Sequence, residues 1–191
     1  MTSPAAAPVR TRTTWAVDPL HSLVEFSIKH LVVTTVKGRF TAFAGTIVLD
    51  EAEPARSAVE AEIDVASVDT GQPQRDDHLR TSDFFEVERY PKITFRSTRV
   101  EPLSQDRFRV VGDLTMRGVT REIALDATYN GRTRHPRGYD VAGFTAETTI
   151  NRDDFGVQFN MALETGGWAL GKTVRVLIEI EAIQQESAAA P

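Results

Sequence analysis

Residues 174–182 read Val-Arg-Val-Leu-Ile-Glu-Ile-Glu-Ala, and they indicate the fold more clearly than any other stretch of the chain. Apolar side chains recur at every second position, so Val174, Ile178 and Ala182 share one face while Arg175 lies on the other. A period of two is typical of a β-strand with one buried and one wet face. Strands of this kind belong mostly to antiparallel sheets.

The same alternation recurs along most of the chain, in residues 22–30, 43–49, 59–65, 107–116 and 122–129. Glycines separate these runs, and we expect hairpin turns at Gly118, Asn130-Gly131 and Gly138. Residues 72–85 do not alternate and predict a short helix or an ordered loop, which Pro91 ends. About eight strands and one short helix predict an all-β fold, an antiparallel β-barrel that is closed or nearly closed.

Length and composition limit the organisation of the chain. Its 191 residues fit one domain, which we place at 14–184 between disordered segments at 1–13 and 185–191 that are rich in Ala. The chain has no cysteine, which excludes a disulfide framework, thiolate catalysis and thiolate metal sites.

Charge and hydropathy exclude further classes of function. The 22 basic and 27 acidic residues are interspersed, and without a basic stripe we expect no nucleic-acid partner. No run reaches the roughly 18 apolar residues of a membrane span, so we expect no stable membrane insertion. Residues 1–14 lack the continuous apolar stretch of a secretory signal, which predicts a cytoplasmic protein.

Residues 166–173 fit the phosphate-loop pattern G-x-x-x-x-G-K-[ST]. Such a loop binds phosphates because it leads into a helix, and here the following residues alternate as a strand. We therefore interpret the glycines as a hairpin approach and expect no nucleotide cofactor.

Signatures of catalysis and of metal binding are absent from the sequence. The four histidines, His21, His30, His78 and His135, have no H-E-x-x-H spacing. A metal site assembled from distant residues stays open, although hydrogen-bonded structural histidines are more common. The pairs Asp76-Asp77 and Asp153-Asp154 are interpreted as caps of turns or helices, and no G-x-S-x-G elbow occurs. We expect no catalytic residue, no resident metal and no cofactor.

Small side chains at several positions predict free space inside the barrel. These positions are Ala42, Ala44, Gly45, Ala61, Gly112, Ala127, Gly143 and Ala146. Phenylalanines are spread over nearly every segment, mostly as packed core. Together they favour an elongated apolar cavity, unless neighbouring side chains fill the gaps.

Residues 18–26 fit the pattern D-x-x-H-S-x-x-x-F that opens the YceI-like family. Further blocks that resemble this family follow in the same order at 38–45, 75–85, 90–95, 112–120 and 150–156. The resemblance extends from about Trp15 to Ala182. It implies a lipocalin-like barrel that binds a polyisoprenoid or a similar long-chain lipid in an internal apolar tunnel, as a non-catalytic carrier. It also implies a homodimer and, for many members, secretion to the periplasm, which we do not carry over to this chain.

For the tunnel lining we predict a set of apolar residues: Phe26, Ile28, Phe84, Phe85, Phe95, Met116 and Phe144. For the polar end of the ligand, near the barrel mouth, we predict Arg75, His78 and Arg152, because an anionic or carbonyl head needs hydrogen-bond donors. His21 and Ser22 are interpreted as residues that fix the turn of the first strand.

Two other functions stay open on the sequence alone. One is an enzyme or sensor that acts on a bound lipid through His21 or His78, which a set of nucleophile, base and oxyanion donors would favour. The other is an interaction module whose barrel is filled by its own side chains, which a densely packed interior would favour.

Overall fold

A computed structural model of the protein describes residues 12–164 and 166–186. The disorder expected at 1–11 and 187–191 concerns residues outside these ranges. The first strand begins at Arg12, before the domain boundary that we placed at residue 14.

Strands dominate the described chain, and their bounds are β1 Arg12–Val17, β2 Leu23–His30, β3 Thr34–Phe40, β4 Phe43–Asp50, β5 Ala58–Asp64, β6 Val68–Asp69, β7 Lys92–Pro102, β8 Arg107–Met116, β9 Val119–Arg134, β10 Asp140–Asn151 and β11 Leu170–Gln184. One α-helix, α1, spans Pro73–Arg80, inside the stretch predicted as a helix or loop. Short 3-10 helices occupy Pro54–Arg56 (η1), Val65–Ser67 (η2) and Arg152–Phe155 (η3). In the part of the chain described, no helix is both long and apolar enough to cross a membrane.

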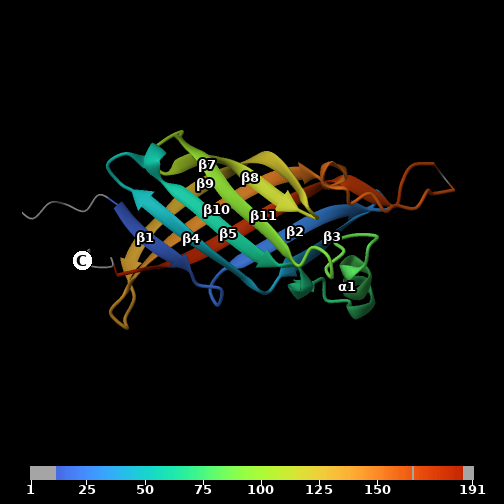
Figure 1. Ribbon diagram of the computed structural model, residues 1–191, viewed down its shortest axis with the longest axis horizontal. Helices are drawn as coiled ribbons and strands as arrows, with labels where there is room; N and C mark the ends of the chain where they lie inside the picture. Colours follow the sequence, from blue (N-terminus) through green and yellow to red (C-terminus); the bar gives the residue numbers. More distant parts are fainter. Residues whose placement is uncertain (1–11, 165, 187–191) are drawn as a thin grey trace, which may run out of the picture.

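Eight strands form a closed ring in the order β1-β4-β5-β7-β8-β9-β10-β11, because β1 pairs with both β4 and β11 (Figure 1). Every pairing between these strands is antiparallel. The predicted closed antiparallel barrel with a single short helix is therefore confirmed. Closure matters because it removes the open sheet edges that invite aggregation.

β10 pairs with one edge of β11, and the other edge of β11 is shared between β1 and β2. Its last residues pair with β1, from Ala182 to Gln184, and its earlier residues pair with β2, from Leu170 to Glu179. β2 in turn pairs with β3, and β3 with the short β6. We call the end with α1 and the β2–β3 turn the helix end (Figure 1). The opposite end, with the start of β1 and the β4–β5 loop at 51–57, is called the loop end.

One predicted turn is wrong. Asn130-Gly131 lies inside β9, which continues to Arg134, and the chain turns at residues 136–138 instead. The register with β10 shifts between Gly143 and Phe144, so Asn130 is an extra residue on its strand. Gly131 has φ +103°, a conformation that suits glycine in a β-bulge as well as in a turn.

Candidate functional site

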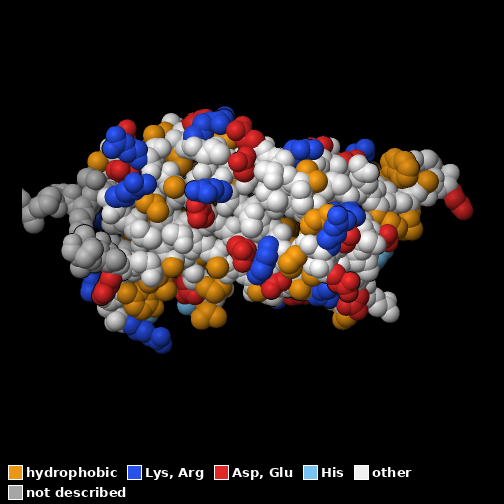
Figure 2. Space-filling view, viewed as in Figure 1, with side chains coloured by type: hydrophobic (Ala, Val, Ile, Leu, Met, Phe, Trp, Pro, Cys, Tyr) orange, Lys and Arg blue, Asp and Glu red, His pale blue; other side chains and the backbone are white. Residues whose placement is uncertain are grey.

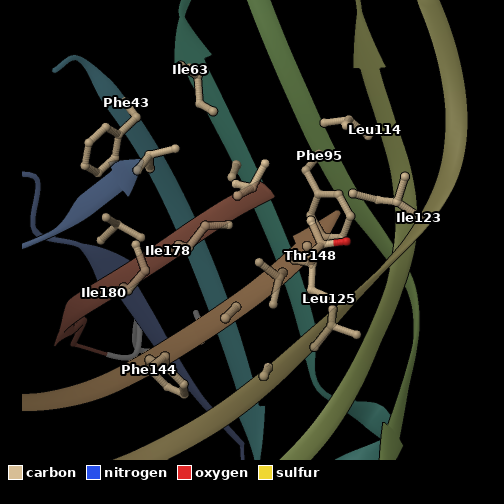
Figure 3. Close-up of a pocket in the computed structure, with 18 of the residues that line it drawn as sticks. Phe43, Ile63, Phe95, Leu114, Ile123, Leu125, Phe144, Thr148, Ile178 and Ile180 are labelled. Carbon is tan, nitrogen blue, oxygen red and sulfur yellow. The ribbon is translucent and has the colours of Figure 1, made fainter. Parts of the chain in front are cut away.

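The barrel encloses an apolar cavity of about 580 Å³. Its wall is built by alternate residues of the ring strands and of β2, together with Phe40 of β3 and residues that follow α1 and η3. Figure 3 shows Phe43, Phe95 and Phe144 pointing into this space from different strands, with Ile178 and Ile180 of β11 on another side. A volume of this size falls in the usual range of small-molecule sites.

All seven predicted apolar lining residues lie on the cavity wall. Phe26 and Ile28 come from β2, Phe95 from β7, Met116 from β8 and Phe144 from β10. Phe84 and Phe85 follow α1 and cover the helix end of the cavity, where the Phe40 and Phe85 ring centroids lie 5.9 Å apart.

Several wall residues were not predicted as ligand contacts, among them Phe43, Ile63, Leu114, Ile123, Leu125, Ile178 and Ile180. The signal for them was available in the sequence. Most of them occupy the apolar face of the same alternating runs that predicted the strands, so once a barrel is assumed they point inward.

Small residues keep part of the interior open. Ala61, Ala127 and Ala146 lie on the wall, and the latter two are direct cross-strand partners. Others of the predicted set do not face inward: Ala42 is exposed, and a side chain at Gly143 would meet Asn130. The remaining cavity argues against a barrel that is filled by its own side chains.

Arg152 brings a cation to the helix end of the cavity. It begins η3, lines the cavity and is only 4% exposed. Its Nη1 donates to the carbonyls of Val157 (2.7 Å) and Phe159 (2.9 Å), and its Nε donates to Gly171 (2.9 Å). These bonds tie the segment after η3 to the start of β11.

The Arg152 guanidinium forms no ion pair with any carboxylate of the described chain, and its burial lowers the pKa of this group. Its Nη2 has no hydrogen-bond acceptor among the described residues. Every fully buried side-chain nitrogen of the described chain has a hydrogen-bond partner. Because Nη2 has none, it keeps some accessible surface. A buried cation of this kind is costly without a counter-charge and is prepared to bind an anionic or carbonyl oxygen.

Arg75 and His78, the other predicted head contacts, lie on α1 and do not line the cavity. The Arg75 side chain donates to the hydroxyl and the carbonyl of Thr70, at 2.7 and 2.8 Å. His78 Nε2 lies 2.8 Å from Asp83 Oδ2, and its ring packs edge-on against Phe84 at 5.0 Å between centroids. Both side chains hold α1 and its neighbouring loop in place.

At the loop end the cavity reaches the surface. The exposed residues Glu51, Gln105 and Arg132 border it there. Glu51 follows β4 and Arg132 lies near the end of β9, two strands that are opposite one another in the ring, so their ion pair of 2.6 Å crosses the opening. No pattern in the sequence relates these two residues.

Trp15 fills the barrel beside this opening. The indole is fully buried in a cluster with Ile47, Ala142 and Ala182, and its Nε1 donates to Thr13 Oγ1 at 2.8 Å. The two alanines leave the room that the indole occupies.

Asp18, His21 and Glu181 meet at the junction where β11 passes from β1 to β2. His21 Nδ1 lies 2.8 Å from Asp18 Oδ2 and 3.7 Å from Glu181 Oε1. The hydrogen bond between them raises the pKa of His21 and lowers the pKa of Asp18. Ser22 Oγ accepts from the Glu181 N–H and donates to its carbonyl oxygen.

These contacts agree with the interpretation that His21 and Ser22 fix the turn of the first strand. One nitrogen or oxygen atom of each of the three side chains also lies within 4.8 Å of the others, which is close enough to coordinate a metal ion. Asp18 already accepts from the Leu20 N–H and from His21, so the turn accounts for the geometry of the cluster.

The phosphate-loop pattern is followed by a strand, as predicted. β11 begins at Leu170, inside the pattern, and continues past its last residue, Thr173. Gly166 and Gly167 have φ of +85° and +91°, which hairpin turns require.

Known proteins resemble this chain over most of its length. A UPF0312 protein of Staphylococcus aureus is 41% identical over 164 residues, which cover 85% of this chain and 93% of that protein. The crystal structure of a Campylobacter jejuni YCEI protein matches with a TM-score of 0.69 and 32% identity, covering 83% of this chain and 91% of that one.

A third comparison concerns the fold alone. A domain from Saccharophagus degradans, described as a polyisoprenoid binding domain, matches with a TM-score of 0.66 and 17% identity over 91% of this chain and 99% of that one. The family model of the YceI-like domain matches residues 15–182. The chain therefore belongs to the YceI-like domain family.

Proposed function

We propose that this protein binds a long-chain amphiphile of the polyisoprenoid class in the cavity of its barrel and carries it without chemical change. The observation behind the proposal is the apolar cavity of about 580 Å³, with an opening at the loop end. Membership of the YceI-like family and the likeness to a fold described as polyisoprenoid binding support it. The homodimer and the cytoplasmic location expected from the sequence stay predictions.

The size of the cavity limits the ligand. At about 30 Å³ for each water-sized group, the volume accommodates roughly twenty such groups, close to a chain of four isoprene units. Burial of about twenty methyl and methylene groups is worth roughly 16 kcal/mol, against an association cost on the order of 4–15 kcal/mol. Burial of the apolar chain therefore offsets the cost of association.

The polar end of the ligand is proposed to lie beside Arg152. This side chain is the cation on the cavity wall at the helix end, and its Nη2 is free to donate. A phosphate or carboxylate there would supply the counter-charge that the described chain does not. Arg75 and His78 have no part in this proposal because they lie off the wall.

Filling the cavity is the direct test. Ala127→Leu with Ala146→Leu adds two side chains that point inward from paired positions. The matched control is Asp126→Leu with Glu147→Leu, a neighbouring pair of the same two strands that is exposed. Binding of geranylgeraniol and geranylgeranyl phosphate is measured by native mass spectrometry and calorimetry.

We expect the inward pair to weaken binding of both ligands at least about tenfold, because the added methyl groups occupy the volume of the chain. The outward pair should bind as the wild type does. Equal binding by both double variants, or no binding of either lipid by the wild type, would contradict the proposal.

A further inference from the structure

Exposed apolar side chains gather at the helix end of the molecule. The β2–β3 turn exposes Leu31, Val32 and Val33, of which the last two are 77% and 83% exposed. A neighbouring hairpin exposes Met161 and Trp168, at 59% and 55%. We call these five residues the apolar tip. Figure 2 shows hydrophobic side chains at this end of the molecule, on the right.

The two hairpins of the apolar tip lie side by side. The Leu31 N–H donates to the Ala169 carbonyl at 2.7 Å, and His30 pairs with Leu170. Two other large apolar residues of the described chain are strongly exposed, Leu20 and Leu103, and they lie on separate turns. Five of the seven such side chains therefore share one end of the molecule.

The residue types of the β2–β3 turn do not suit the backbone conformation that they adopt. Leu31 and Val32 have φ of +50° and +64°, the left-handed region that glycine and asparagine favour and that a β-branched residue rarely adopts. The β8–β9 turn has the same left-handed pair, but there the residues are Arg117 and Gly118. Backbone outliers of this kind cluster at functional sites. Both the conformation and the solubility of the protein would favour polar residues in this turn, so its apolar residues need another explanation.

From these observations we propose that the apolar tip docks the protein on the surface of a lipid bilayer. Five side chains are too few for a stable dimer, which buries about 20–30 residues on each partner. They do match the interfacial layer of a bilayer, where a tryptophan with aliphatic neighbours is favoured.

The surroundings of the apolar tip fit the same partner. Lys29, two residues before Leu31, is exposed and forms no ion pair with the described residues, so it can meet the phosphates of lipid headgroups. Glu164, exposed on the hairpin of Met161 and Trp168, is the opposing charge beside the tip. The strands that carry the tip also continue into the cavity, because Ile28 and Leu170 line its wall. Docking would therefore hold the helix end of the barrel, which Phe84 and Phe85 cover, against the bilayer and leave the opening at the loop end free.

The test uses lipid vesicles of phosphatidylcholine with a fraction of phosphatidylglycerol, without any prenyl lipid. The tip variant combines Leu31→Asn, Val32→Gly and Val33→Thr, which suit an exposed left-handed turn. Leu20→Asn and Leu103→Asn, on separate turns, are the matched controls. Vesicle flotation measures binding, and the emission of Trp168 measures its transfer to an apolar environment, since Trp15 is fully buried in the protein.

We expect the wild type and both controls to float with the vesicles and to show a blue shift of the Trp168 emission. The tip variant should bind at least about tenfold more weakly, since it loses three exposed aliphatic side chains. Its melting temperature should equal or exceed that of the wild type, which separates lost docking from lost folding.

Three results would overturn the proposal: no vesicle binding by the wild type, equal loss in the controls, or no loss in the tip variant. A concentration-dependent dimer that the tip variant abolishes, without vesicle binding, would assign the tip to a second copy of the chain. Because the assay contains no cargo, its failure is distinct from a failure of the proposed lipid binding.

Discussion

The two ends of the barrel use their interiors differently. At the loop end the chain supplies its own filling, because the buried Trp15 occupies the room left by Ala142 and Ala182. At the helix end Phe84 and Phe85 cover the cavity, and the buried Arg152 lies on its wall without a carboxylate partner in the described chain. Packed apolar volume stabilises a fold, whereas an unpaired buried charge costs stability and is retained where it binds something. We therefore expect Trp15 at the loop end to contribute to stability alone, and Arg152 at the helix end to contribute to ligand chemistry as well.

Trp15→Ala should have the largest effect on stability. Loss of a fully buried indole leaves a cavity and is expected to lower the free energy of unfolding by about 3–5 kcal/mol, measured by urea denaturation. Trp15→Phe, which keeps an aromatic ring, should lose distinctly less. A loss below about 1 kcal/mol for the alanine variant would mean that the loop end is not a centre of stability.

Arg152→Met should weaken the binding of one of two ligands that have the same chain length but different head groups. Affinity for geranylgeranyl phosphate is expected to fall at least about tenfold, because a charge-assisted contact is lost, while affinity for geranylgeraniol stays unchanged. The free energy of unfolding should also fall, since three carbonyls lose their donor.

Calorimetric titrations with both lipids test this difference at the helix end. Arg152→Lys, which keeps the charge but not the fork of donors, should be intermediate for the phosphate. An equal loss of affinity for the alcohol and the phosphate would show that Arg152 only positions its segment.

The smallest effect is expected at the junction between the ends, where His21 meets Asp18. The pKa of His21 is raised above its ordinary value of 6.5, so its contribution to stability is complete below that pH and is lost as the pH rises through the folded pKa. The pKa of Asp18 is lowered, so its contribution is lost only as the pH falls through the folded value. The difference in melting temperature between wild type and His21→Gln should therefore be greatest near pH 5–6 and shrink toward about pH 9.

Thermal melts at several pH values measure that difference. A constant difference across the range would show that the ion pair does not couple β1 to β2, and that the Ser22 contacts with Glu181 hold the junction alone.

The sequence was a good guide wherever one strand carries its own signal. Alternation at 174–182 predicted β11, and the break at 72–85 predicted the position of α1. The turn at Asn130-Gly131 was misplaced because glycine with positive φ serves a bulge and a turn equally, and only the register with β10 distinguishes them.

The site was predictable in its apolar part and less so in its polar part. Inward residues follow from alternation, and all seven predicted ones line the cavity. Arg75 and His78 were chosen for their donors, but Thr70 and Asp83 determine where those donors point. The Trp15 cluster and the ion pair between Glu51 and Arg132 join strands far apart in sequence, so no local pattern indicates them.

The closure of the ring by β1 has a consequence for synthesis of the protein. β1 completes the barrel by pairing Trp15 with Gln184, residues from nearly opposite ends of the chain. Until β11 is available, β1 lacks one of its two partner strands, and the ring cannot close. Contacts of such long sequence separation form slowly, and exposed edges pair with other chains. The interval before β11 pairs with β1 is therefore the time at which the unfinished barrel is most exposed to aggregation.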